Sequence, residues 1–410
     1  MIARPDAERL DAADPLAPFR DRFALPEGIV YLDGNSLGAL PKAAAARVAE
    51  VVAREWGVGL VGSWNDAGWI DLPRRVGDKV ARLVGAGEGE VVCTDSTSVN
   101  VFKVLSAALA LRPGRSTILS EEGNFPTDLY VAGGLARLVG RGHRLRLVPK
   151  ADVSSALDAD TAVLLLTHVD YRSGERHDLA AVTAAAHEAG VLVAWDLAHS
   201  AGAMPVDLTG AGADFAVGCG YKYLCGGPGA PAFLWVPRRL QGSFSQPLSG
   251  WLGHAAPFAF ESAYRPAEGI GRFLCGTPPI LSMSALDAAL DVLLEADLEL
   301  VREKSQALGS FFVEAVEEAC GDALRLVSPR EAARRGSQVS FAHPDAYAVM
   351  QALIARGVVG DVRAPDVLRF GFAPLYVRFV DAFDAARALA DVLSSRVHER
   401  PEFRRVAAVT

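Results

Sequence analysis

The sequence lacks the features that mark several large classes of protein. It has no dense block of Lys and Arg, and its formal net charge of −8 argues against a nucleic-acid surface. Its eight histidines do not show the metal-ligand spacing His-x-x-x-His. There is no internal repeat and no low-complexity tract, and no apolar run approaches the length of a membrane span. At 410 residues the chain is long enough for two or three domains with a large core.

Cysteine is also scarce. The five cysteines are an odd number without a Cys-x-x-Cys motif, which predicts free thiols in a reducing compartment. The first 15 residues carry charged side chains throughout, so they do not have the pattern of a signal peptide. We therefore expect a soluble, cytoplasmic protein that has no membrane or nucleic-acid partner and holds no metal.

The strongest positive signal is a lysine, Lys222, set among small residues in the Gly-rich stretch Gly218–Gly229. Upstream, the apolar run Val191–Trp195 leads into Asp196. A lysine in a Gly-rich loop is usually only solvated, and an Asp after a strand more often caps a helix. Together, however, an amine and a carboxylate at the ends of neighbouring strands are what pyridoxal phosphate needs. The amine forms the Schiff base, and the carboxylate keeps the pyridine nitrogen protonated.

A candidate phosphate site precedes this pair. The predicted strand Glu90–Thr94 leads into Asp95–Asn100, and a helix is expected to run on to Arg112. Ser96, Thr97 and Ser98 place three hydroxyls at the helix start, where backbone N–H groups can bind an anion. Ordinary N-capping explains one of these hydroxyls but not a run of three.

From about residue 73, predicted strands and helices alternate. This order predicts an α/β fold with a mostly parallel, doubly wound sheet, whose ligands collect at the carboxyl ends of the strands. Five candidate residues fall at such ends: Thr97, Phe125, Thr167, Asp196 and Lys222. Their shared position is the best structural argument that the sequence offers for a single site.

The flanking segments are expected to be less regular. Residues 1–29 are predicted to form an amphipathic helical arm, and Pro41 to open a helix. Trp56, Trp64 and Trp69 follow in a Gly-rich segment that has no helical or strand period. We expect their side chains either to anchor the core or to form the wall of an aromatic substrate pocket.

A long helical stretch from about residue 281 to 319 is expected to lead to a smaller α+β domain, with strands at 337–342 and 367–372. We therefore predict three parts: an N-terminal arm and segment (1–72), a large cofactor-binding domain (73–285) and a small C-terminal domain (286–410).

With these residues assembled, the chain resembles the kynureninase family, whose members are pyridoxal-phosphate enzymes of fold type I, the aspartate aminotransferase fold. The resemblance covers nearly the whole chain. The lysine and the aspartate are common to the whole superfamily, whereas the other blocks in this order are much more specific. The blocks are Tyr31–Gly38, Phe125–Asp128, Asp196–His199, Tyr221–Leu224, Gly250–His254 and Pro278–Ile280.

The resemblance implies a role for individual positions. The residues implied in catalysis are Lys222, Asp196 and Tyr221. The positions implied to contact the cofactor are Thr97, Ser98, Phe125, Asp128, Thr167, Asp196, His199, Tyr221 and Lys222, with Trp251 and Thr277 reaching the phosphate from the partner subunit of a homodimer with shared active sites. Some family members carry Asn where this chain has Thr277, and a hydroxyl can still donate to phosphate. Arg369 resembles the arginine that grips the substrate α-carboxylate, and Ser36 and Trp64 are further implied substrate contacts.

The implied reaction is hydrolysis of L-kynurenine, or of 3-hydroxy-L-kynurenine, to anthranilate or 3-hydroxyanthranilate and L-alanine. It would belong to tryptophan catabolism along the kynurenine pathway and serve NAD biosynthesis. Two other fold type I enzymes stay open as alternatives. A class V aminotransferase would use the same Lys222, Asp196 and Arg369. A cysteine desulfurase-like lyase would need a nucleophilic cysteine, for which Cys275 and Cys320 are the candidates.

Overall fold

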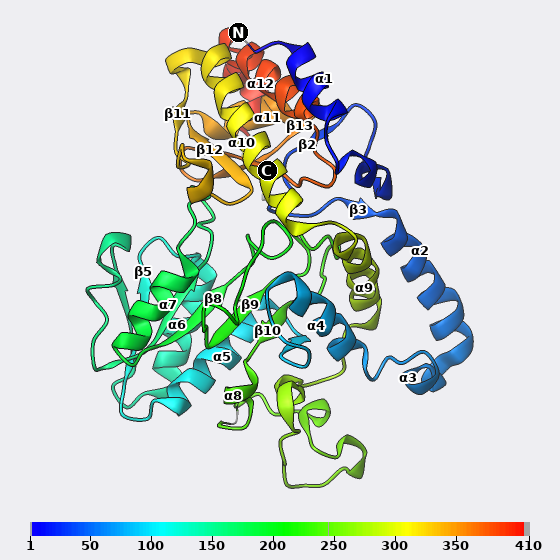
Figure 1. Ribbon diagram of the computed structural model, residues 1–410, viewed down its shortest axis with the longest axis vertical. Coiled ribbons are helices and arrows are strands. Elements are labelled where there is room, and N and C mark those ends of the chain that lie inside the picture. The colour runs from blue at the N-terminus through cyan, green and yellow to red at the C-terminus, as the bar shows by residue number, and fades with distance from the viewer. Residues whose placement is uncertain (1, 245, 406–410) are drawn as a thin grey trace.

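The structure, a computed structural model, describes residues 2–244 and 246–405. Its centre is a seven-stranded sheet with the strand order β4-β10-β9-β8-β7-β5-β6 (Figure 1). Strand β10 runs antiparallel to both neighbours, and the other adjacent pairs are parallel. The strands are β4 (Val91–Cys93), β5 (Thr117–Glu121), β6 (Arg144–Val148), β7 (Thr161–Thr167), β8 (Leu192–Asp196), β9 (Phe215–Gly218) and β10 (Phe233–Trp235). The predicted doubly wound α/β sheet is confirmed.

The central strands are apolar along their whole length because both faces of the sheet are covered. In β7, Val163 and Leu165 belong to one buried cluster, whereas Leu164 and Leu166 belong to the other. Alternate residues of a strand point to opposite faces, so a continuous apolar run is what a doubly covered parallel strand requires. The helices of this part of the chain are α4 (Leu72–Leu83), α5 (Thr97–Leu111), α6 (Pro126–Val139), α7 (Leu179–Glu188), α8 (Arg238–Gln241) and α9 (Ile280–Leu294).

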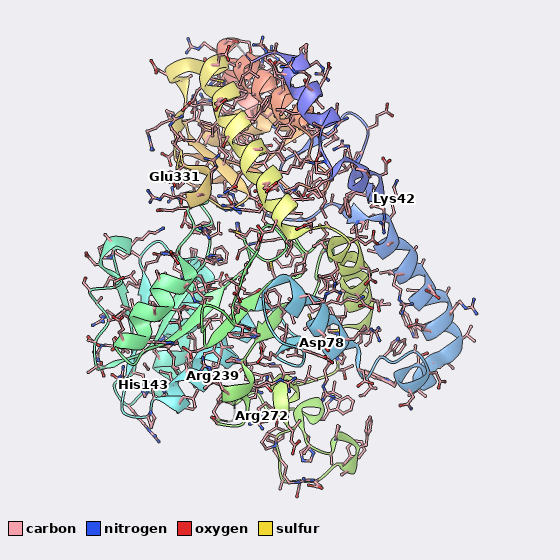
Figure 2. All side chains as sticks on the ribbon, viewed as in Figure 1. Lys42, Asp78, His143, Arg239, Arg272 and Glu331 are labelled. Atoms are coloured by element: carbon pink, nitrogen blue, oxygen red, sulfur yellow. The ribbon has the colours of Figure 1, made fainter. Side chains whose placement is uncertain are left out.

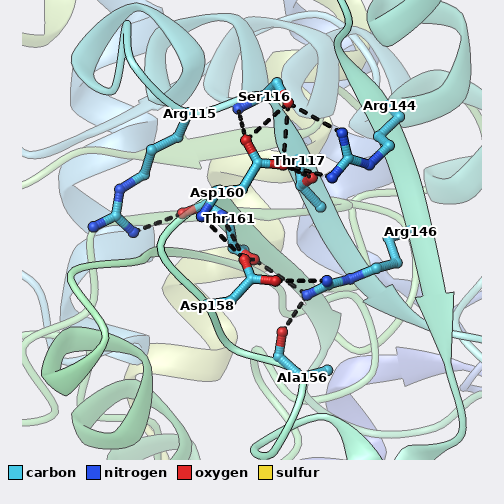
Figure 3. Close-up of polar contacts among 9 residues, drawn as sticks. All are labelled: Arg115, Ser116, Thr117, Arg144, Arg146, Ala156, Asp158, Asp160 and Thr161. Carbon is cyan, nitrogen blue, oxygen red and sulfur yellow. Dashed lines mark hydrogen bonds and ion pairs between the residues drawn. The ribbon is translucent and has the colours of Figure 1, made fainter.

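The edge strand β6 is held by ion pairs at its amino end (Figure 3). Arg144 pairs with Asp160 at 2.6 Å, and Arg146 pairs with Asp158 at 2.7 Å. Asp160 also accepts a hydrogen bond from the Thr117 hydroxyl on the neighbouring strand, at 2.7 Å. Charged side chains on an exposed edge oppose pairing with other strands, so this cluster both fixes β6 and protects it.

The C-terminal part is a second, smaller α+β unit. Its four-stranded antiparallel sheet has the order β11-β12-β15-β14. The long helix α10 packs against α12 over this sheet (Figure 1). The elements are α10 (Leu298–Cys320), β11 (Arg325–Leu326), β12 (Gln338–Ala342), α11 (Ala346–Ile354), β13 (Val358–Val359), β14 (Asp361–Arg363), β15 (Val367–Gly371) and α12 (Phe379–Ser394).

The N-terminal arm packs on this smaller unit. Helix α1 (Arg4–Ala12) contacts α12, and β2 (Val30–Tyr31) pairs in parallel with β13. The arm also contains β1 (Phe23–Ala24), which pairs with β3 (Leu40–Pro41). The chain then turns into α2 (Lys42–Glu50). The domain boundaries at residues 72 and 285 stay a prediction. The contacts of the arm described here are with α12 and β13, which belong to the C-terminal part of the chain.

One helical prediction was wrong in extent. The expected helical arm over residues 1–29 has α1 and a 3₁₀ turn at Ala17–Arg22 as its helical segments, and it also contains β1; Pro15 lies between the two helical segments and Pro26 follows β1. The expected helical stretch over 281–319 consists of two helices, α9 and α10. Asp297 starts the second one as its N-cap, with its carboxylate accepting from the Glu299 N–H at 2.8 Å.

The tryptophan segment is helical, contrary to the prediction. Helix α2 continues as a π-helix over Val51–Gly59, followed by the short α3 (Ser63–Asp66). A π-helix pairs i with i+5, so its apolar residues do not show the spacing of an α-helix. Trp69 is buried, whereas Trp56 is 57% exposed, so only one of these two can be a core anchor.

Residues 250–273 form a lobe that extends from the large domain (Figure 1). It contains 3₁₀ turns at Trp251–Gly253 and Gly269–Phe273. Arg272, labelled in Figure 2, ties the base of the lobe by donating to the carbonyls of Ala267 and Phe244 at 3.1 and 3.0 Å. Among the described helices, none has the length and apolar content needed to cross a membrane. The five cysteines, all in the described part of the chain, are free thiols.

Candidate active site

One cavity of about 650 Å³ lies at the carboxyl ends of the strands of the large sheet. This volume is in the range of small-molecule sites. Nine of the residues predicted to hold a cofactor line the cavity: Thr97, Ser98, Phe125, Asp128, Thr167, Asp196, His199, Tyr221 and Lys222. The structure thus brings them together, and the role of each one stays a prediction.

The strand order explains why residues so far apart in sequence meet. Strands β9, β8, β7 and β5 are consecutive neighbours, and all four are parallel. Lys222 follows β9, Asp196 ends β8, Thr167 ends β7 and Phe125 follows β5. Parallel neighbours end at the same edge, so four side chains from four strands reach one hollow there.

The loop that carries Lys222 is fixed by close backbone packing. The Gly226 N–H donates to the Gly220 carbonyl at 2.8 Å, and the Cys225 N–H donates to the Lys222 carbonyl at 2.9 Å. A Cβ at Gly220 would lie 2.4 Å from the Pro231 carbonyl oxygen, so only glycine fits this turn. The loop holds the Lys222 amine over the Phe125 ring, with Nζ 5.9 Å from the ring centroid.

The turn at 33–38 packs directly on this loop. The Gly38 N–H donates to the Tyr221 carbonyl at 2.8 Å. A Cβ on Gly38 would come within 2.3 Å of the Lys222 carbonyl oxygen, so glycine is required for the close approach. Leu37 from the same turn lines the cavity. The N-terminal segment therefore forms one wall of the site.

Two carboxyl groups and an imidazole lie buried at the inner end of the cavity. Asp196 is 3% exposed, and its Oδ1 accepts from the Ala198 N–H at 2.8 Å. Burial raises the pKa of Asp196, although the nearby Lys222 opposes this shift. Burial and the adjacent Asp196 raise the pKa of Asp128 well above its usual range, which favours its neutral form. Burial, followed by the Lys222 charge, holds the pKa of His199 well below its usual value, so this ring is neutral.

Asp196 does not cap a regular helix in the part of the chain that the structure describes, so the alternative to a role in the site is wrong. No regular helix follows β8 before β9 among the described residues. Instead, Asp128 Oδ2 and His199 Nδ1 are buried without a hydrogen-bond partner in the described part of the protein. Buried polar atoms without partners are costly, and here they surround a cavity of ligand size. A ligand with a charged ring nitrogen and a ring hydroxyl, such as the pyridine ring of pyridoxal phosphate, fits this arrangement.

Hydroxyl groups gather at the other end of the cavity. Ser96 is the N-cap of α5, and its Oγ accepts from the Val99 N–H at 3.4 Å. Ser96, Thr97 and Ser98 all line the cavity, at the positive end of a helix of 15 residues. One hydroxyl caps the helix, which leaves Thr97 and Ser98 to meet a phosphate group.

Arg369 lies outside the lining of this cavity but joins the loop that borders it. It is fully buried on β15, and its Nη1 donates to the carbonyl of Tyr171, a cavity residue, at 2.6 Å. The Asp361 carboxylate accepts a bidentate pair of hydrogen bonds from this guanidinium, with Nε donating to Oδ1 at 2.6 Å and Nη2 donating to Oδ2. The Ser36 hydroxyl accepts from Nη2 at 3.0 Å. The predicted substrate contacts Arg369 and Ser36 thus belong to one cluster.

Three predicted residues lie away from the cavity of their own chain. Among the described lining residues, Trp64, Trp251 and Thr277 are absent. Trp64 and Trp251 contact each other, with ring centroids 6.4 Å apart, and Thr277 is exposed. That Trp251 and Thr277 face a partner subunit stays a prediction.

Sequence reasoning missed several residues that line the cavity. Tyr171, on the polar loop after β7, forms an edge-on contact with Phe125 at 5.3 Å between ring centroids. Nothing in the spacing of this loop signalled the contact, since it depends on how the loop folds back. The sequence could have predicted that Asp95 lines the cavity, because it directly precedes the three hydroxyl-bearing residues. The other unpredicted lining residues are Leu37, Thr127, Ala198, Pro228, Gly229, Ala230 and Ala232, while Ser96 belongs to the predicted row of hydroxyls.

Solved structures with the same fold define the class of protein. The cysteine desulfurase CsdA from Escherichia coli aligns with a TM-score of 0.76 at 21% identity, covering 93% of this chain and 98% of that one. A cysteine desulfurase from Thermococcus onnurineus aligns with a TM-score of 0.77 at 20% identity, covering 92% and 98%. At this level of identity the likeness concerns the fold alone. The chain therefore has fold type I, the fold of these two enzymes.

Sequence relatives narrow the class to one family. A kynureninase from Burkholderia pseudomallei is 57% identical over 416 residues, and one from Pseudomonas fluorescens is 54% identical, each over 100% of both chains. The kynureninase C-terminal domain family matches residues 301–389. The chain belongs to the kynureninase family. No group of His, Cys, Asp or Glu suited to a metal ion occurs among the described residues.

Proposed function

We propose that the protein hydrolyses L-kynurenine, or its 3-hydroxy derivative, to anthranilate or 3-hydroxyanthranilate and L-alanine, with pyridoxal phosphate as cofactor. The observation that carries the proposal is the cavity itself. In a chain of the kynureninase family, it gathers an amine, a buried carboxylate, an aromatic wall and a row of hydroxyls. Bound pyridoxal phosphate would supply an acceptor for the electrons released at the α- and β-carbons of the substrate.

Four residues of the chain would bind the cofactor, hold the substrate and transfer the proton. Lys222 would bind the cofactor covalently and then move the proton at the substrate Cα. Asp196 would keep the pyridine nitrogen protonated, because a carboxylate stabilises the adjacent positive charge. Phe125 would stack on the ring. Arg369 would orient the α-carboxylate through Nη1, the guanidinium nitrogen that Asp361 does not hold and that donates to the Tyr171 carbonyl of the cavity wall.

The bond cleavage needs one water molecule. Its hydroxyl adds to the ketone carbon, which becomes the carboxylate of anthranilate when the Cβ–Cγ bond breaks. A proton on Cβ then completes alanine, so the atoms of kynurenine and water balance. Burial raises the pKa of Tyr221, so its hydroxyl stays protonated and can donate a hydrogen bond near this ketone. Tyr221 also remains a candidate phosphate ligand.

The test is to incubate the purified holoprotein with L-kynurenine and to quantify the products. We expect anthranilate and alanine in equal amounts, without added 2-oxo acid, and no product from the Lys222→Ala variant. Kynurenic acid or glutamate that forms only with added 2-oxoglutarate would instead assign the protein to the aminotransferases. A desulfurase is not favoured, because Cys275 and Cys320 are absent from the described lining of the cavity.

We also propose that the protein is a homodimer with shared active sites. An apolar surface without a partner supports this proposal, since monomers rarely expose contiguous apolar patches of this kind. Along the π-helix and the turn after it, five large apolar side chains are exposed: Val52, Trp56, Val58, Leu60 and Val61. Because Trp64 contacts Trp251, we propose that both aromatic side chains serve the site of the partner subunit.

For the cellular role, we propose that the protein acts in the cytoplasm, in tryptophan catabolism through kynurenine, and contributes to NAD biosynthesis. The five free thiols support a reducing compartment. If this proposal is correct, cells that lose the protein accumulate kynurenine, and the protein is recovered in the cytoplasmic fraction. Unchanged kynurenine levels would contradict the pathway assignment.

A further inference from the structure

An acidic residue lies where the cofactor phosphate is expected. Asp95 lines the cavity immediately before the hydroxyl-bearing residues Ser96, Thr97 and Ser98. A phosphate group carries about two negative charges near neutral pH. A carboxylate at this end of the cavity would repel the phosphate unless another group neutralises it.

Lys103 provides the opposite charge from inside the protein. It lies further along α5, it is fully buried, and its Nζ is 2.5 Å from Asp95 Oδ2. Long side chains on a helix run back toward its N-terminus, which explains how the ammonium group reaches the turn before the helix. A buried lysine without a partner is very costly, so this ammonium group and the Asp95 carboxylate depend on each other.

The same ammonium group also joins the turn to a distant segment. Lys103 Nζ donates to the Phe273 carbonyl, at the end of the 3₁₀ turn Gly269–Phe273 that precedes Thr277. The Thr94 hydroxyl donates to Asp95 Oδ2 at 2.8 Å, and the Asn100 amide donates to the Thr94 carbonyl at 2.9 Å. The start of α5 is therefore held by four polar side chains, those of Thr94, Asp95, Asn100 and Lys103.

The backbone of Asp95 shows why this turn needs support. Its φ is +49°, in the left-handed region that few residues other than glycine adopt. Asp and Asn are the side chains that tolerate this region best. The bend directs the chain into the N-cap Ser96, and thereby aims the first hydroxyls and N–H groups of α5 into the cavity.

We propose that Lys103 is a positioning residue for the cofactor phosphate, because it neutralises Asp95 and holds the turn that presents Thr97 and Ser98. The inference rests on the proposed function, since it takes the cofactor to be pyridoxal phosphate. Lys103 does not touch the phosphate; it acts through Asp95 and the helix start.

The test compares two probes on the full chain after removal of cofactor. Pyridoxal phosphate and pyridoxal differ only in the phosphate, so a phosphate effect appears with the first probe alone. We expect Lys103→Met to weaken binding of pyridoxal phosphate by about tenfold or more and to leave pyridoxal binding nearly unchanged. The double variant Asp95→Asn/Lys103→Met, which removes both charges and keeps a residue tolerant of the left-handed backbone, should regain most of the affinity.

The single variant Asp95→Asn keeps the inference testable if Lys103→Met does not fold. It removes only the negative charge, because the Asn amide oxygen can still accept from Lys103, which also keeps its hydrogen bond to the Phe273 carbonyl. We therefore expect affinity for pyridoxal phosphate equal to or tighter than that of the wild type. Equal affinity in wild type and Lys103→Met would overturn the inference, as would a loss in Asp95→Asn. If the wild type itself bound pyridoxal phosphate no better than pyridoxal, the proposed function would fail instead.

Discussion

At the scale of single residues, the two buried carboxyl groups of the cavity, Asp196 and Asp128, have different surroundings. Asp196 ends β8 close to Lys222, whereas Asp128 lies in the first turn of α6. Burial and the neighbouring Asp196 raise the pKa of Asp128 well above its usual range, whereas the nearby Lys222 opposes the effect of burial on the pKa of Asp196. We therefore expect Asp196 to be the carboxylate that stabilises a positive ring nitrogen.

This difference predicts unequal effects of two matched substitutions. We expect Asp196→Asn to bind the cofactor but to lose about a hundredfold or more in kcat, because the charge that holds the ring nitrogen protonated is gone. Asp128→Asn replaces a group whose neutral form is favoured by burial and by Asp196, so its loss should be much smaller. The measurements are kcat with L-kynurenine and the visible absorption of the bound cofactor. An equal loss in the two variants would show that the assignment of charge is wrong.

The second prediction at this scale concerns Arg369. We expect Arg369→Ala to raise KM for L-kynurenine roughly ten- to hundredfold, with a smaller effect on kcat, because hydrogen bonds to the α-carboxylate are lost. In this variant the Asp361 carboxylate still has its ion pair with Arg363, at 3.0 Å, so the buried charge of Asp361 stays partly compensated. Arg172→Ala, which removes a part-exposed arginine from the nearby loop, is the control and should leave KM unchanged. A fall in kcat alone would contradict a role in substrate binding.

At the scale of elements, the turn at 33–38 and the lysine loop act as one unit. Gly38 contacts the backbone of Lys222, and Ser36 from the same turn contacts Arg369. The turn also continues from β2, which pairs with β13 of the smaller domain. Thus one short segment connects the predicted Schiff-base lysine with the predicted carboxylate-binding arginine.

This connection predicts a strong effect of a single methyl group. In Gly38→Ala, the new Cβ would lie 2.3 Å from the Lys222 carbonyl oxygen, so the loop must move. We expect a loss of about ten- to hundredfold in kcat/KM, because the amine is displaced from its working position. Gly123→Ala is the control, since a Cβ there meets no atom within 4 Å. If both variants were fully active, the tight contact would have no role in positioning Lys222.

At the scale of the whole molecule, the proposed shared sites depend on Trp251 and Thr277. Trp251 and Thr277 were expected to reach a phosphate, yet they lie outside the described lining of their own cavity. The lobe that carries Trp251 extends away from the body of the large domain (Figure 1). A symmetric dimer, in which the same surface serves both sites, would complete each cavity.

Subunit mixing tests this arrangement. One parent is Lys222→Ala, and the other is a Trp251→Ala/Thr277→Ala double variant that has first been shown to be inactive. Each mixed dimer has one site with both defects and one with neither. Random reassortment makes half of the dimers mixed, so about a quarter of wild-type activity should return. Mixing each parent with itself is the control. Activity that stays at the parental level after proven exchange would rule out shared sites.

The sequence by itself determined the class of fold and the centre of the site. Apolar strands alternating with helices imply a parallel sheet, and parallel strands end at one edge. For this reason the alternation alone is enough to predict that Lys222, Asp196, Thr167 and Phe125 meet. The family blocks added His199, Asp128 and the residues that lie outside the cavity of their own chain.

Only the tertiary structure decided which groups neutralise and restrain these residues. The pairing of Lys103 with Asp95, the hold of Asp361 on Arg369 and the contact of Tyr171 with Phe125 have no signature in local spacing. The contact of Tyr171 with Phe125 joins segments far apart in the chain. In the other two pairs the partners are close in sequence, but the left-handed turn at Asp95 and the pairing of β14 with β15 set their distances. Such contacts depend on how the elements pack, and the pattern of a single segment does not contain that information.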